Sequence, residues 1–184
     1  MPADFEREIG NPRRPVVTDL TFPGEPLLMA FGGIAGRMAA FPPFEFFKLT
    51  RHLRVNKAYL RDLDQRWYHG GLRGVTGSIG ETADYLGCMM SACRAQRTVV
   101  FGSSMGGYAA LLFGSLVRAN AVNAFSPHTW LRDRWSIRNR EKLKALHDGF
   151  SGEYFDLSEV PGVSAGSGED QRSLLHRLLG RKVA

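Results

Sequence analysis

From residue 16 onward, short apolar runs alternate with longer amphipathic ones, and this alternation constrains the fold more than any other feature. Short apolar runs bounded by Gly or Pro predict buried strands, and the longer runs predict helices. Strands separated by helices of this length indicate a parallel sheet covered on both faces. We therefore expect an α/β fold: a three-layer sandwich with a mostly parallel central sheet flanked by helices. The expected strands are 16–22, 26–31, 56–63, 98–101 and 121–125, and the expected helices are 42–53, 78–95, 105–116 and 131–147.

Length and composition indicate one ordinary globular domain over residues 1–184. The chain has 184 residues, of which 43% are hydrophobic and 23% charged, so it can bury a core but has little room for a second domain. Residues 161–184 read as a loop and a C-terminal helix, loosely packed on the rest. The apolar runs are shorter than the roughly 18 residues of a membrane span. Residues 1–15 are polar and mixed in charge, unlike a secretory signal, so we expect a cytoplasmic protein without a membrane span.

The excess of basic residues does not form a nucleic-acid-binding pattern. Lys and Arg number 24 against 18 Asp and Glu, a net charge of +6. The basic residues are scattered, with mild gatherings at 132–144 and 172–182 that we interpret as solvated helix faces. The two cysteines, Cys88 and Cys93, lie in one expected helix but not on a common face, which indicates neither a metal site nor a disulfide. No cofactor, metal or nucleic-acid partner is expected.

A strand, a tight turn and a helix follow one another at residues 98–108. The turn reads Gly102-Ser-Ser-Met-Gly106, a G-x-S-x-G pattern that places Ser104 on a sharp bend between strand and helix. Such a bend strains the backbone, and side chains two residues on either side would collide. Glycines stand at both positions around Ser104, whereas a turn centred on Ser103 would place Phe101 and Met105 there. Ser104 is therefore the predicted nucleophile; the alternative is a plain glycine turn in which Ser104 only caps the helix.

The expected partner of a reactive serine is a pair of backbone N–H groups that stabilise an oxyanion. The helix after the turn directs unpaired N–H groups towards Ser104, so the N–H of Met105 is one predicted donor. The glycine-rich segment 32–36 follows the strand at 26–31, and glycines allow close approach to a ligand. The second donor is predicted to be the N–H of Gly33 or Ile34; the alternative is a plain glycine-rich connection.

These motifs make the chain resemble the α/β-hydrolase superfamily over about residues 16–150. The resemblance rests on the glycine segment at 32–36, the turn at 102–106 and the strand at 121–125. It implies acyl transfer to water: Ser104 attacks an ester, thioester or amide carbonyl, and the acyl-enzyme is then hydrolysed. It also implies an acid and a histidine after the serine. A full member would have a further strand between that acid and that histidine, so we expect a fold that lacks part of the C-terminal end.

Several residues could complete the site. His176 has the expected order for the base, although on the helix predicted at 171–181 it lies on the polar side, as a plain exposed histidine would. Asp156, in a strand-like segment, is the predicted acid. His128 comes directly after a predicted strand, and Tyr68 and His69 also follow a strand's carboxyl end, so these three are predicted to bind substrate. The alternative acids are Asp133 and Asp170. His147 also follows the serine, but it lies at the end of a predicted helix and is interpreted as a residue that stabilises the helix C-terminus.

Two functions are compatible with this pattern. The first is a small cytoplasmic serine hydrolase of esterase or thioesterase type, acting on a small acyl substrate through Ser104. The second is a non-catalytic binding or interaction protein on a degenerate, shortened hydrolase fold. In that case the sheet edge left by the missing strand would favour a homodimer or strand addition by a partner.

Overall fold

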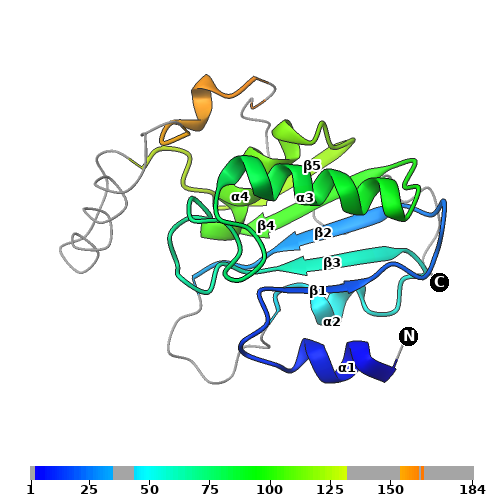
Figure 1. The fold of residues 1–184 in the computed structure, drawn as a ribbon. Helices are drawn as coiled ribbons and strands as arrows, with labels where there is room; N and C mark the ends of the chain where they lie inside the picture. The colour runs from blue at the N-terminus through cyan, green and yellow to red at the C-terminus, as the bar shows by residue number, and fades with distance from the viewer. Residues whose placement is uncertain (1–2, 35–43, 132–153, 162, 164–184) are drawn as a thin grey trace.

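The computed structural model describes residues 3–34, 44–131, 154–161 and 163, and within them five strands form one sheet (Figure 1). The strand order is β1-β3-β2-β4-β5. Strands β2 to β5 run parallel to one another, and β1 is antiparallel to β3. The expected α/β class and mostly parallel sheet are confirmed. The strands are β1 (Val16–Asp19), β2 (Leu27–Phe31), β3 (Asn56–Leu60), β4 (Thr98–Ser103) and β5 (Ala121–Phe125).

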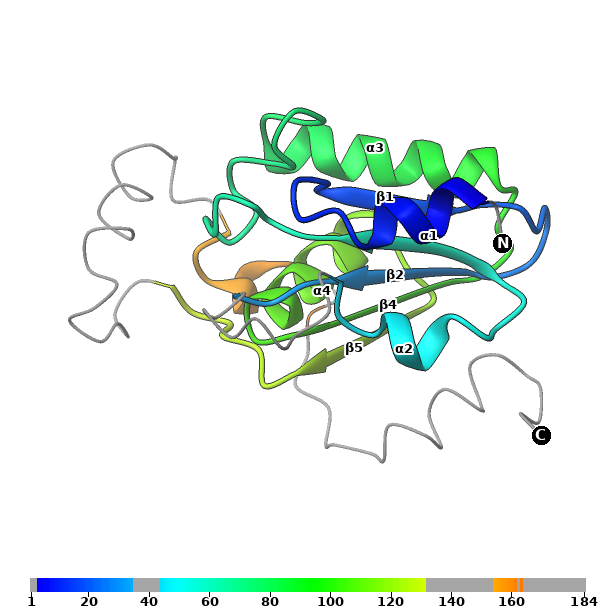
Figure 2. The ribbon, with the colours of Figure 1, turned by 90° about the horizontal axis from the view of Figure 1, so that it is seen from below.

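Helices lie on both faces of this sheet. They are α1 (Ala3–Ile9), α2 (Phe47–Thr50), α3 (Ile79–Ala92) and α4 (Met105–Leu116), and a 3-10 turn, η2 (Leu157–Glu159), follows later in the chain. In Figure 1, α3 and α4 lie above the strands and α1 and α2 below them. Figure 2, seen from below, has α1 and α2 in front of the strands. No helix in the described part of the chain is long and apolar enough to cross a membrane.

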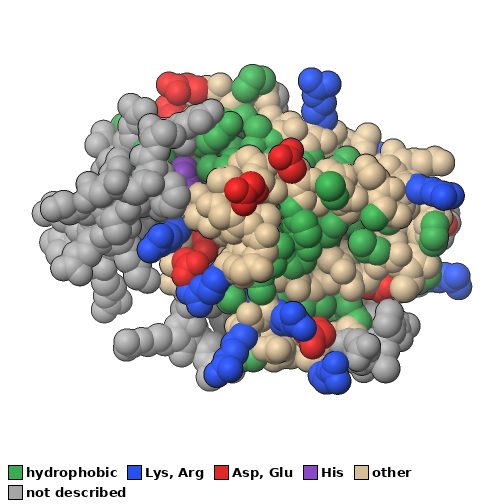
Figure 3. All heavy atoms as spheres, viewed as in Figure 1, with side chains coloured by type: hydrophobic (Ala, Val, Ile, Leu, Met, Phe, Trp, Pro, Cys, Tyr) green, Lys and Arg blue, Asp and Glu red, His purple; other side chains and the backbone are tan. Residues whose placement is uncertain are grey.

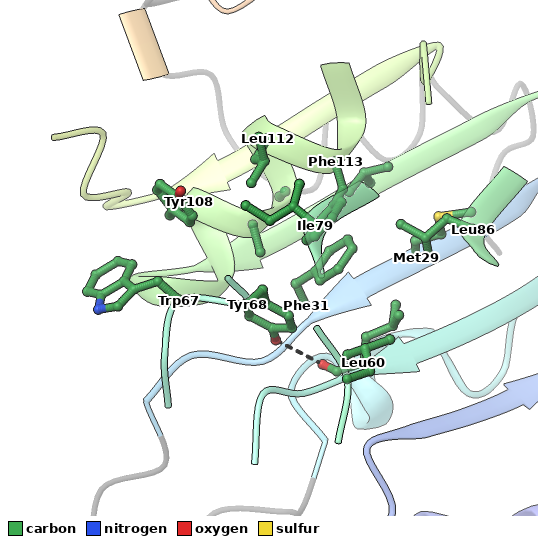
Figure 4. Packing of buried hydrophobic residues seen from close by; sticks show 14 of the residues in the cluster. Met29, Phe31, Leu60, Trp67, Tyr68, Ile79, Leu86, Tyr108, Leu112 and Phe113 are labelled. Atoms are coloured by element: carbon green, nitrogen blue, oxygen red, sulfur yellow. Dashed lines mark hydrogen bonds between the residues drawn. The ribbon is translucent and has the colours of Figure 1, made fainter. Parts of the chain in front are cut away.

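The two faces of the sheet bury separate hydrophobic clusters, as side-chain alternation along a strand requires. On β2, Leu27, Met29 and Phe31 belong to the larger cluster, which includes residues of α3 and α4. Leu28 and Ala30 belong to the smaller cluster, with residues of α1 and from the segment around α2. Figure 4 shows part of the larger cluster between β2 and the helices above it. A strand that is buried on both faces reads as a continuous apolar run, which is why β2 was recognisable in the sequence.

The N-terminal helix α1 was not expected, because its segment is mostly polar. Among the α1 residues whose burial is described, Phe5 and Ile9 are buried, and both belong to the smaller cluster. Phe5 lies 6.1 Å, centroid to centroid, from the rings of both Phe47 and Tyr59. Two apolar residues four apart give one contact point on a helix, and a pattern that short does not stand out in a sequence.

Strand β1 ends at Asp19, not at Phe22 as predicted, because a side chain binds the following backbone. The amide of Asn56 accepts a hydrogen bond from the Phe22 N–H at 3.1 Å and donates to the Phe22 carbonyl at 2.7 Å. These bonds take the place of strand pairing at Phe22. The chain then turns at Gly24, which has a φ of +82° that favours glycine.

Strand β3 ends at Leu60, three residues earlier than predicted, and Asp62 organises the loop that follows. The Asp62 carboxylate is buried and accepts backbone N–H groups from three residues of the loop: Asp64, Arg66 and Tyr68. Burial raises the pKa of Asp62, and these hydrogen bonds offset part of that rise. Asp62 therefore fixes the path of the loop that leads to Tyr68.

The remaining predictions concern the helices and strand β5. The bounds predicted for α4 and β5 are those observed. Helix α3 begins one residue after Ser78, whose hydroxyl accepts the Glu81 N–H at 3.1 Å, as the predicted cap requires. Helix α2 is a single turn within the longer helix expected at 42–53, of which residues 42–43 lie outside the described residues. The helix expected at 131–147, apart from residue 131, and the segment 161–184, apart from residues 161 and 163, also lie outside the described residues.

A buried ion pair joins β1 to β3. Lys57 Nζ lies 3.3 Å from Asp19 Oδ2, and the two side chains are 2% and 0% exposed. Lys57 also donates to the Val55 carbonyl, and Asp19 accepts the Thr21 hydroxyl. Asp19 and Lys57 are opposite one another in the antiparallel register. A one-residue slip would separate the charges, so the pair specifies how β1 docks.

Replacing Lys57 by Met should destabilise the protein by about 3–5 kcal/mol, because Asp19 would keep a buried charge without its partner. The double variant Lys57→Met with Asp19→Asn should lose less than Lys57→Met alone. Urea unfolding followed by circular dichroism measures both. If the loss of unfolding free energy in the double variant equalled the sum of the losses in Lys57→Met and Asp19→Asn, the two charges would not depend on each other.

Candidate functional site

Ser104 lies in the turn between β4 and α4, in a backbone conformation that non-glycine residues rarely adopt. Its φ is 55° and its ψ is −117°. It is the N-cap residue of α4, yet its side chain makes no capping hydrogen bond. The serine is half-buried. The side chain of Ser104 therefore does not cap the helix, and the strain predicted for this turn is present.

Gly102 and Gly106 are required by the close approach of backbone on both sides of Ser104. A Cβ on Gly102 would lie 2.0 Å from the Gly106 carbonyl oxygen. A Cβ on Gly106 would lie 2.1 Å from the Phe31 carbonyl oxygen, at the end of β2. Both distances are far below any van der Waals contact. The collision expected from the sequence is thus confirmed, and the turn is pressed against the end of the neighbouring strand.

The loop after β2 reaches the same point from the other side. Phe31 and Gly102 are partners in the parallel register of β2 and β4, so Gly33 and Ser104 follow those strands at one edge of the sheet. A Cβ on Gly33 would lie 2.8 Å from the Ser103 carbonyl oxygen and 3.7 Å from Ser104 Cβ. The structure therefore brings Gly33 next to Ser104, as expected of an oxyanion loop.

The two predicted N–H donors differ in their surroundings. Met105 is the first residue of α4, so its N–H has no acceptor within the helix. The N–H of Gly33 donates to Glu45 Oε1 at 2.9 Å. Ile34, the alternative donor, has a side chain exposed at the end of the described segment. No pattern in the sequence indicates this role of Glu45, because its carboxyl group, twelve residues after Gly33, reaches the loop only through the tertiary fold.

The carboxyl group of Glu45 is partly removed from water at this position. Burial raises the pKa of Glu45, and the hydrogen bond from Gly33 offsets part of the rise. Glu45 lies between two anchored aromatic residues. Phe44 is buried against Tyr59, and Phe46 packs edge-to-face on Phe101 with ring centroids 5.1 Å apart.

Tyr68, predicted to bind substrate, is fully buried. Its hydroxyl donates to the Gly32 carbonyl at 2.8 Å and lies 3.3 Å from the Leu60 carbonyl, towards which it points in Figure 4. Burial raises the pKa of this phenol well above its ordinary value, so it remains a donor. In this structure Tyr68 holds the Gly32–Gly33 loop in place from inside the core.

His69 is buried in an aromatic network beneath α4. Its Nε2 lies 2.7 Å from the Tyr108 hydroxyl, which donates to the Tyr154 carbonyl at 2.8 Å. A hydroxyl has one proton and a carbonyl can only accept, so Nε2 of His69 is protonated and donates to Tyr108. Nε2 is therefore not available to accept a proton from Ser104. The His69 ring also packs against Phe155, with centroids 5.0 Å apart.

His128 lies on the surface beyond the end of β5. Its ring lies nearly perpendicular to that of the buried Trp67, with centroids 5.6 Å apart, and Trp67 in turn contacts Tyr108. The strand that precedes it is tied to the Ser104 turn, because the Ser104 N–H donates to the Phe125 carbonyl at 2.8 Å. His128 is thus an exposed imidazole on the same edge of the sheet as the predicted nucleophile.

Asp156, the predicted acid, caps the 3-10 turn η2. Its Oδ1 accepts the Ser158 N–H at 2.9 Å and the Ser158 hydroxyl at 2.6 Å. The segment around Asp156 pairs in an antiparallel bridge with Trp130, a few residues after β5. The predicted base His176 lies outside the described residues, as do three alternatives: Asp133, His147 and Asp170. The structure therefore brings together Ser104, Met105 and Gly33, and the acid and base stay predictions.

Replacing Gly106 by Ala should destabilise the protein by about 1–3 kcal/mol or more, because the new methyl group overlaps the Phe31 carbonyl. Gly87, in the middle of α3, provides the matched control, since a Cβ there meets nothing within 4 Å. Gly87→Ala should stabilise the protein by about 0.5–1 kcal/mol. Thermal unfolding of both variants gives the comparison. Equal effects would show that the turn is not pressed against β2.

Comparisons with known proteins do not place this chain in a family. Neither the family models nor the curated proteins include a match to it. The described residues contain no group of three or more His, Cys, Asp or Glu side chains that could hold a metal ion. On the face shown in Figure 3, several Lys and Arg side chains lie along the lower left with acidic ones between them, and others are spread over the rest of the face. The Ser104 turn is therefore the feature of the described residues from which we infer a function.

Proposed function

We propose that the protein is a serine hydrolase that cleaves a small ester or thioester through an acyl-enzyme on Ser104. One observation carries the proposal: Ser104 is strained, lies between two glycines at which a Cβ would overlap neighbouring backbone, and makes no capping bond. Strain of about 1–3 kcal/mol persists at functional sites because the surrounding structure enforces it. A strained serine between two crowded glycines, at the start of a helix, is the arrangement that a nucleophile turn requires.

The proposed reaction follows from the groups around the serine. A base removes the proton of the Ser104 hydroxyl as Oγ attacks the substrate carbonyl carbon, and the carbonyl oxygen becomes an oxyanion. In this proposal the N–H groups of Met105 and Gly33 donate to that oxygen, and the Gly33 N–H, which is bonded to Glu45 Oε1 in the structure, exchanges one oxygen for the other. The intermediate collapses with loss of the alcohol or thiol, which takes the proton from the base. Water then attacks the acyl-enzyme in the same way and releases the acid.

Two histidines, His176 and His128, are the proposed candidates for the base. His176 has the chain order that the resemblance to α/β-hydrolases implies, with Asp156 as its acid. His128 is the alternative favoured by the described residues, since it is exposed on the same sheet edge as Ser104. His69 is disfavoured because its Nε2 already donates to Tyr108. Without a base, serine is a poor nucleophile at neutral pH.

A fluorophosphonate probe should label Ser104 covalently, with fluoride leaving phosphorus, and Ser104→Ala should abolish the labelling. The neighbouring Ser103→Ala is the matched control and should keep it, because Ser103 lies in β4 before the strained turn. Mass spectrometry of the digested protein identifies the modified residue. If neither the folded wild-type protein nor a folded Glu45→Ala variant, in which the Gly33 N–H loses its carboxyl partner, takes up the probe, the enzymatic proposal is refuted and the non-catalytic binding protein is favoured instead.

Alanine variants of the two histidines distinguish the candidate bases. Loss of the true base should slow labelling and ester hydrolysis by about 10²–10⁴-fold, the usual contribution of general base catalysis. The other variant should keep the wild-type rate. The rates of His128→Ala and His176→Ala are compared by following release of p-nitrophenol from p-nitrophenyl acetate. Equal, wild-type rates in both variants would exclude both residues as the base.

A further inference from the structure

The carboxylate of Glu45 occupies the N–H group that a substrate oxyanion would need. The N–H of Gly33 and Glu45 Oε1 are joined at 2.9 Å. The same Glu45 oxygen lies 3.0 Å from the point where a Cβ of Gly33 would stand, and that point is 3.7 Å from Ser104 Cβ. A carboxyl oxygen of the protein is thus bound beside the predicted nucleophile, on the donor predicted to stabilise a negative oxygen.

We propose that Glu45 is an internal competitor for the oxyanion site, so that a substrate carbonyl engages Gly33 only after the Glu45 side chain has moved away. The inference rests on the proposed function of Ser104 and adds a residue that limits its reactivity. A carboxylate oxygen and a tetrahedral oxyanion demand the same donor. They are also of the same charge, so they cannot share it without repulsion.

The structure indicates that only the side chain of Glu45 has to move. Its neighbours fix the backbone: Phe44 is 1% exposed, and Phe46 packs on Phe101 and Phe125. Arg61 stacks over the Phe44 ring at 4.4 Å and donates to backbone carbonyls of Asn11 and Arg14. A rotation of the Glu45 side chain would free the Gly33 N–H without disturbing this packing.

Two variants test the competition. Glu45→Ala removes the competing oxygen, and Glu45→Gln keeps an oxygen acceptor but removes the charge. We expect Ser104 labelling by a fluorophosphonate to be about tenfold faster or more in Glu45→Ala than in wild type, since one oxyanion donor is worth 10²–10³-fold. Glu45→Gln should lie between the two. Glu81→Gln is the matched control and should not change the rate, because Glu81 also accepts a backbone N–H, from Gly77, but on α3.

A second readout does not depend on activity. In ¹⁵N-labelled protein, the amide proton of Gly33 should resonate downfield in wild type, where it is bonded to a carboxylate. It should move upfield in Glu45→Ala, while amides elsewhere in the sheet keep their positions. The same spectra show whether each variant is folded, and Glu45→Gln supplies the rates if Glu45→Ala does not fold.

The outcomes separate this inference from the proposed function. Faster labelling in the Glu45 variants, including labelling that appears only in them, supports the competition. Labelling of Ser104 at one rate in wild type and both variants overturns the inference and leaves the hydrolase proposal intact. Slower labelling in folded Glu45 variants also overturns it, because Glu45 would then assist the reaction. No labelling of Ser104 in any folded protein overturns both.

Discussion

The strained backbone of Ser104 is the constraint on which the rest of this account depends. A φ of 55° with a ψ of −117° costs on the order of 1–3 kcal/mol in a non-glycine residue. The surrounding structure maintains it: the Ser104 N–H is bonded to the Phe125 carbonyl of β5, and the glycines at 102 and 106 let backbone pack against backbone. The strain lies where a parallel sheet presents the carboxyl ends of its strands, which is where such folds bind ligands.

The neighbouring loops are organised from within the core. Asp62 gathers backbone N–H groups of the loop after β3, and that loop delivers Tyr68 to the Gly32 carbonyl. Gly32 therefore has a fixed carbonyl, and the next residue, Gly33, has a fixed N–H beside Ser104. Buried polar groups that are fully paired make a site rigid, and backbone donors in a rigid site are preorganised to stabilise charge that develops in the transition state. Glu45 then determines whether the Gly33 donor is free.

Local patterns in the sequence predicted the helix that follows the turn and the glycines within it, whereas β4 runs to Ser103, two residues past its predicted end at Phe101. The bounds of α4 and β5, the cap at Ser78 and the two obligatory glycines all follow from features within a few residues of one another. Close approach of backbone leaves a mark in a sequence, because only glycine satisfies it.

Contacts between distant segments could not be predicted in this way. The antiparallel docking of β1 depends on Asp19 meeting Lys57, and the shortening of β1 depends on Asn56 binding Phe22. The position of Glu45 on Gly33 and the burial of Tyr68 likewise arise from tertiary packing. A tyrosine or histidine after a strand reads equally well as a ligand contact or as a core residue. Only the fold showed that Tyr68 and His69 are buried.

The most direct test of the central claim is a crystal structure of the protein after reaction with a fluorophosphonate. We predict that phosphorus is bonded to Ser104 Oγ and that φ of Ser104 remains positive. The phosphonyl oxygen should lie within hydrogen-bond distance of the Met105 and Gly33 N–H groups, with the Glu45 carboxylate displaced. A relaxed Ser104 with negative φ, or a phosphonyl oxygen directed away from both N–H groups, would contradict it.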